Sequence, residues 1–213
     1  MVAKDAAACF GIDCGTAMSV KGSAAFLIII YCCAVLTAVG RTRHDECPTA
    51  EEYAVFTALF PDSANSDNTS QIVIEDKTVG SDLIGDLDLR KFLKDLQPLK
   101  AETIDDFLVR NQVQCKLIDH FDLKVKVNLV SAEELRKIFN GDLDEGWKAF
   151  HNTYPGVGAF QTLSRVGFSK DHNQALVYFP HFCGSLCGQG EYFVLEKIEG
   201  KWRVKNRIGS WIS

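Results

Sequence analysis

Two cysteines and a histidine near the C-terminal end of the sequence have the side chains best suited to chemistry. Cys183 and Cys187 are separated by the tripeptide 184–186, and His181 precedes Cys183 by two residues. Glycines within and just after this segment allow the positive φ angles of a tight turn. The sequence therefore predicts a hairpin with both cysteines at its tip, and a disulfide between them is the simplest expectation.

The same residues allow two other kinds of site. His181, Cys183 and Cys187 could hold zinc or copper, because residues two apart in a strand point to one side, and His172 is the nearest candidate for a fourth ligand. A redox-active dithiol is the other alternative, although its three-residue spacer differs from the Cys-x-x-Cys of thioredoxin-like sites. Thiols in an oxidising compartment tend to pair with each other, which favours the disulfide.

A hydrolase-like site could also be assembled from polar residues that are distant in the sequence. The candidates are His151, His181 and Ser164, with His120 between Asp119 and Asp122 as a weaker one. However, the segment 184–188 lacks the central serine of a Gly-x-Ser-x-Gly elbow. The sequence thus identifies no catalytic residue, and we expect neither a resident metal nor another cofactor.

An uncharged apolar run, residues 23–39, predicts the compartment. Read from Met18, the run follows Lys21 and closes with Ala38-Val39-Gly40, which are the features of a secretory signal. Residues 1–40 are then an N-terminal extension plus signal peptide, and residues 41–213 are one exported domain in the periplasm or outside the cell. The alternative is a membrane anchor through residues 23–39, although a helix of this length spans about 26 Å and a hydrocarbon core measures about 30 Å.

Export affects how the remaining cysteines are interpreted. Four of them follow residue 40, an even number that allows three pairings. The short spacing favours Cys183–Cys187, which leaves Cys47–Cys115 to tie the N-terminal segment to the domain. The net charge of −5, without a basic stripe, argues against a nucleic-acid partner.

Local patterns predict an α+β fold. Apolar residues at helical spacing and the Ser131–Glu134 capping box indicate helices over 50–60, 88–96, 103–109, 131–139 and 143–151. Strand-like runs cover 71–78, 123–129, 160–168, 174–182, 191–198 and 201–208. Short turns separate the last four runs, so we expect a C-terminal antiparallel meander with the helices packed on one of its faces.

Several segments of the C-terminal half resemble a recurring group of uncharacterised secreted or membrane-associated bacterial proteins. The residues that carry the resemblance include Leu163-Ser-Arg-Val-Gly-Phe168, Gln174-Ala-Leu-Val-Tyr178, Cys183-Gly-Ser-Leu-Cys-Gly-Gln-Gly190, Leu195-Glu-Lys197 and Gly200-Lys-Trp202. The resemblance implies export and a single domain, and it implies no activity.

These observations favour a binding role over a catalytic one. We expect an exported non-catalytic domain that binds a ligand, an envelope component or another protein through its sheet or its hairpin tip. The hydrolase-like enzyme and the metal or redox module at the cysteine loop remain the alternatives.

Overall fold

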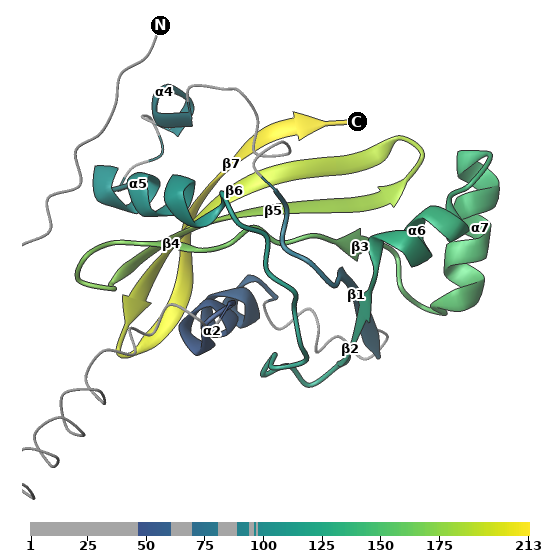
Figure 1. Cartoon of the computed structure of the whole chain (residues 1–213), viewed down its shortest axis with the longest axis horizontal. Helices are drawn as coiled ribbons and strands as arrows, with labels where there is room; N and C mark the ends of the chain where they lie inside the picture. Colours follow the sequence, from purple (N-terminus) through teal and green to yellow (C-terminus); the bar gives the residue numbers. More distant parts are fainter. Residues whose placement is uncertain (1–46, 61–69, 81–88, 94–95, 97) are drawn as a thin grey trace, which may run out of the picture. The chain divides into compact units, whose positions relative to one another are not determined.

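A mixed seven-stranded sheet organises the part of the chain that the structure describes (Figure 1). In this computed structural model the described residues are 47–60, 70–80, 89–93, 96 and 98–213, so the apolar run at 23–39 lies outside them. The spatial order is β2-β1-β3-β5-β6-β7, with β4 beside β5. The strands are β1 (Gln71–Glu75), β2 (Lys126–Val130), β3 (Phe160–Gln161), β4 (Gly167–Phe168), β5 (Gln174–Gly184), β6 (Cys187–Ile198) and β7 (Lys201–Ile212).

The direction of the strands changes across the sheet. Strands β5, β6 and β7 form the predicted antiparallel meander, whereas β1 runs parallel to both β2 and β3. The predicted strand 160–168 is divided into β3 and β4. Between them the Ser164 hydroxyl, rather than a backbone carbonyl, accepts the Tyr178 N–H at 2.8 Å, which interrupts the ladder with β5.

The described helices are α2 (Ala50–Leu59), α4 (Leu89–Leu93), α5 (Ala101–Arg110), α6 (Ala132–Ile138) and α7 (Leu143–Thr153). The starts of α2, α6 and α7 are fixed by side chains that accept otherwise unpaired backbone N–H groups, whereas α5 has no side-chain cap. Ser131 and Glu134 form the predicted capping box, Thr49 and Glu52 form another, and Asp142 caps the next helix.

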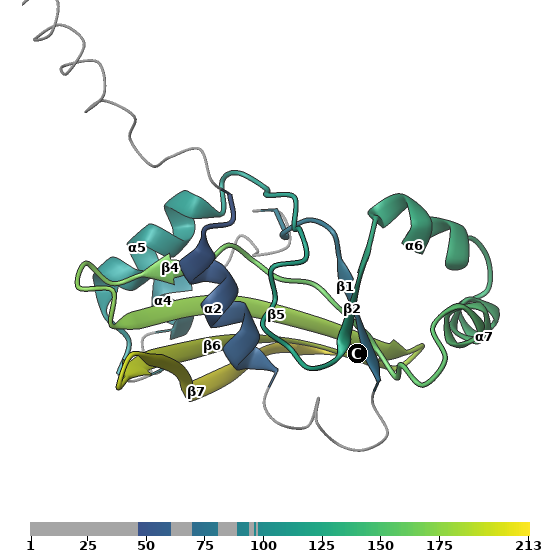
Figure 2. The same cartoon turned by 90° about the horizontal axis from the view of Figure 1, so that it is seen from below.

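Helices cover both faces of the meander, not one face as expected, although the α+β class and the C-terminal antiparallel strands are confirmed. Ala175 and Val177 of β5 pack in one cluster with α2, while Leu176 and Tyr178 pack in a second cluster with α4 and α5. Figure 1 shows α5 above the strands and α2 below them, and Figure 2 shows the face that α2 covers. Both faces of β5 carry apolar side chains, so helices must pack on each face to shield them from water.

A third cluster lies at the other end of the sheet. It joins β1 and β2 to α6 and α7 through Val73, Val130, Leu135, Trp147 and Phe150. In Figure 1, α6 and α7 stand at the same end of the molecule as the β5–β6 hairpin tip. This arrangement brings two helices and a hairpin together where the sheet ends.

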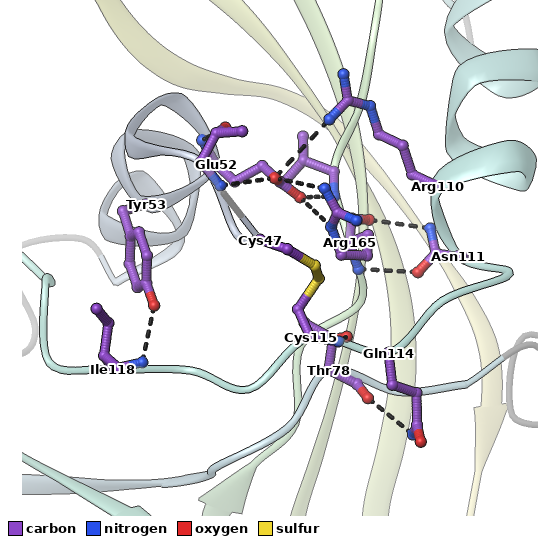
Figure 3. Close-up of a disulfide and its surroundings, with 12 residues drawn as sticks. Cys47, Glu52, Tyr53, Thr78, Arg110, Asn111, Gln114, Cys115, Ile118 and Arg165 are labelled. Atoms are coloured by element: carbon purple, nitrogen blue, oxygen red, sulfur yellow. Dashed lines mark hydrogen bonds and ion pairs between the residues drawn. A yellow bond between two sulfur atoms is a disulfide. The ribbon is translucent and has the colours of Figure 1, made fainter. Parts of the chain in front are cut away.

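The described residues contain two disulfides, in the predicted pairing. Cys47 pairs with Cys115 across 68 residues of sequence and fastens the start of α2 to the loop after α5 (Figure 3). Cys183 pairs with Cys187 across the hairpin tip. Disulfides are typical of oxidising, exported environments. Within the described ranges, no helix is both long and apolar enough to cross a membrane.

Candidate functional site

The most deeply buried charges of the described residues belong to a structural network. Glu52 of α2 is fully buried and accepts hydrogen bonds from Arg165 at 2.8 and 2.9 Å and from the Val166 N–H at 3.1 Å (Figure 3). Burial alone raises the pKa of Glu52, but the hydrogen bonds from Arg165 and the backbone outweigh it and lower the pKa below 4.5. Asn111 holds the backbone of Arg165 from the other side. These groups satisfy one another and therefore position elements rather than substrates.

The residues considered for a hydrolase site have separate structural roles. Ser164 is fully buried, where its hydroxyl donates to the Arg165 carbonyl and accepts the Tyr178 N–H. His151 of α7 contacts the Val157 carbonyl at 3.0 Å, and the His120 ring lies 5.5 Å from the Tyr53 ring. In the described part of the chain, no hydrogen bond joins Ser164, His151 and His181 to one another.

The cysteine loop is closed by its own disulfide. Both sulfur atoms of Cys183 and Cys187 are bonded to each other, so neither is present as a thiolate. His181 and Cys183 line a hollow of about 390 Å³ together with Gln161, whereas His172, the fourth-ligand candidate, contacts Glu51 at 2.9 Å. Among the residues that the structure describes, no group of three or more His, Cys, Asp or Glu side chains is placed to hold a metal ion.

A groove of about 380 Å³ opens beside the hairpin tip and is the best candidate for a functional site. It lies between the tip and the helix pair α6–α7, and its size is within the range of about 300–1,000 Å³ that is typical of ligand sites. The exposed polar residues Arg136, Ser185 and Ser213 form its edge, together with the half-buried Gly184. The walls are apolar and comprise Leu135, Phe139, Leu143, Trp147, Phe160 and Phe182.

Aromatic packing fixes the walls of the groove. Phe160 of β3 and Phe182 of β5 occupy paired positions, and their rings stack with centroids 4.9 Å apart. Phe139 meets Trp147 edge to face at 5.0 Å. This contact requires glycine at position 146, because a Cβ there would lie 2.5 Å from the Phe139 ring. Packing among these rings thus holds the walls of the groove in place.

The hairpin tip is attached to the helix that forms the opposite wall. The Ser185 hydroxyl donates a hydrogen bond to the carboxylate of Asp144, in the first turn of α7. The disulfide closes the turn immediately beside this contact. Together these two links hold the tip next to the helix pair.

Exposed apolar side chains are found around the same tip. Leu143 is 55% exposed, Leu186 87% and Ile212 84%. Leu186 lies between the two cysteines. Ile212 of β7 is paired with Gln189 of β6, which follows Leu186 by three residues. Large exposed apolar groups beside an apolar groove are typical of a binding surface. The site offers apolar contact, a polar edge and a rigid frame.

Sequence reasoning placed the hairpin tip correctly but missed the groove. Its lining comes from α6, α7, β3 and β5, which no local pattern links. One signal pointed to the apolar surface beside the groove: Leu186, which does not line it, is a large apolar residue at the tip of a predicted turn, where solvated residues are usual. Comparison with protein-family models, curated proteins and solved structures finds no match to this chain, so the resemblance seen in the sequence stays a prediction.

Proposed function

We propose that this protein is an exported, non-catalytic binding domain that takes an apolar group of an envelope component into the groove beside its hairpin tip. The observation that carries the proposal is the groove itself, whose six apolar lining residues include the exposed Leu143 at its mouth. Its walls consist of aromatic and aliphatic side chains, which favour association by burial of apolar surface.

The proposed location rests on two further observations. The apolar run 23–39 has the pattern of a secretory signal, and the two disulfides suit an oxidising compartment. We propose that the run is cleaved near Gly40 and that the domain acts in the periplasm or outside the cell.

A neutral apolar dye tests the binding role without knowledge of the natural ligand. N-phenyl-1-naphthylamine fluoresces strongly in apolar surroundings, and we expect its emission to rise on addition of the purified protein. The substitution Leu143→Lys places a charge at the mouth of the groove without disturbing the core, because Leu143 is largely exposed. It should weaken dye binding at least fivefold.

The matched control is Val113→Lys. Val113 is also an exposed apolar residue, at 62%, and it does not line the groove. Dye binding should be unchanged in this variant. Equal binding by the wild-type protein and by both variants would contradict the proposal, because the dye would then be bound elsewhere.

A further inference from the structure

The edge of the groove carries a positive charge that has no acidic partner among the residues that the structure describes. Arg136 of α6 is exposed, and its Nε donates to the Ala132 carbonyl at 3.2 Å. By contrast, its neighbours on the helices are paired: Lys137 with Glu133 at 2.8 Å, and Lys148 with Glu145 at 2.6 Å. No carboxylate of the described residues lies within 4.0 Å of the Arg136 guanidinium, so its remaining N–H groups face solvent beside the groove.

Two other residues at the edge, Ser185 and Ser213, already make hydrogen bonds. The Ser185 hydroxyl donates to Asp144, and the backbone of Ser213 exchanges two hydrogen bonds with Gly188. Phe160 and Phe182, in the walls, are paired with each other within the sheet. A hydrocarbon chain needs no hydrogen-bond partner, so it can lie against these walls without one.

We propose that the groove binds a single acyl chain with a carboxylate head, and that Arg136 binds the head. This inference rests on the proposed binding role of the groove and adds the chemical class of its ligand. The chain would lie against Phe139, Trp147, Phe160 and Phe182. The carboxylate would accept two N–H bonds from the guanidinium, whose planar fork matches its geometry.

A series of straight-chain carboxylates tests whether the groove binds an acyl chain. Hexanoate, octanoate and decanoate, each below its micelle concentration, are titrated into the purified protein, and displacement of N-phenyl-1-naphthylamine is measured. Each methylene group that enters the groove should tighten binding roughly fourfold. Affinity that does not depend on chain length would overturn the proposal.

Two comparisons test the head group. Decyltrimethylammonium has an alkyl chain of similar length and the opposite charge, and it should bind at least tenfold more weakly than decanoate. Arg136→Gln should lower the affinity for decanoate by about tenfold or more, as expected for loss of a hydrogen bond to a charged group, while the chain-length dependence persists. Lys137→Gln removes a neighbouring but paired charge and should change the affinity less than twofold.

The outcomes separate this inference from the proposed function. If decanoate and decyltrimethylammonium bind equally, and Arg136→Gln has no effect, the carboxylate preference is wrong while apolar binding stands. If neither the amphiphiles nor the neutral dye binds, both proposals fail. Binding of decanoate that depends on both Arg136 and Leu143 would support both.

Discussion

The guanidinium of Arg165 and the carboxylate of Glu52 form a bidentate pair, although the two residues are 113 positions apart in the sequence. Glu52 lies in the first turn of α2, and Arg165 lies in the segment that connects β3 to β4. The pair holds α2 against the sheet at the same end as the Cys47–Cys115 disulfide (Figure 3). It is therefore part of the frame and not of the groove.

Breaking this pair should destabilise the protein strongly. Arg165→Met removes the bidentate partner of the buried Glu52 carboxylate and leaves only Arg110, 3.8 Å away, so we expect the free energy of unfolding to fall by about 3–5 kcal/mol. Urea denaturation followed by far-UV circular dichroism measures it. Glu133→Gln, which removes an exposed ion pair with Lys137, should cost less than about 1 kcal/mol. Similar losses of unfolding free energy in the two variants would contradict the structural role of the Glu52–Arg165 pair.

The same carboxylate should make stability depend on pH. The pKa of Glu52 is lower in the folded protein than its ordinary value of 4.5. Below that value the unfolded chain binds a proton more readily than the folded one, so the contribution of Glu52 is present above pH 4.5 and is lost as the pH falls. Urea denaturation between pH 6 and pH 3 should show a steeper loss for the wild type than for Glu52→Gln. Parallel curves would count against this assignment.

Local signals predicted the elements well because their causes are local. The Ser131 capping box marks the start of α6, and the strict alternation after Leu123 marks the strand that becomes β2. The parallel pairing of β1 with β2 and β3 was not predicted, because these strands are short and distant in the sequence. The placement of helices on both faces had a signal in adjacent apolar residues such as Tyr178 and Phe179.

The site could be predicted less well than the fold. The cysteine spacing correctly predicted the hairpin tip and its disulfide. The groove depends on Phe139, Phe160 and Phe182, which come from three separate segments and meet only in the tertiary structure. Likewise, nothing in the sequence near Glu52 or Arg165 indicates that the two side chains pair.

The two disulfides should contribute unequally to stability. In the chain-entropy view, a link across 68 residues constrains the unfolded chain more than a link across four. Replacing Cys47 and Cys115 by serine should cost about 4 kcal/mol, and replacing Cys183 and Cys187 about 2 kcal/mol. Thermal unfolding of the two double variants shows which of the two disulfides contributes more to stability. A larger loss from the hairpin pair would contradict this explanation.

Export should produce a mature protein without free thiols. If the signal is cleaved near Gly40, the four remaining cysteines are those of the two disulfides. N-terminal sequencing of the exported protein should begin near Arg41, and alkylation of the denatured, unreduced protein should add no label. A protein that keeps residues 18–40 in the cytoplasm, or one that takes up two labels, would contradict the prediction.

Mapping of bound apolar dye by backbone NMR tests the central claim, that the groove beside the hairpin tip is the binding site. On titration with N-phenyl-1-naphthylamine, we predict that the largest shifts occur at the amides of Phe139, Leu143, Trp147, Phe160 and Phe182, with saturation at one molecule per chain. Shifts concentrated at α5 and the β4–β5 turn, or no saturable shifts at all, would contradict the claim.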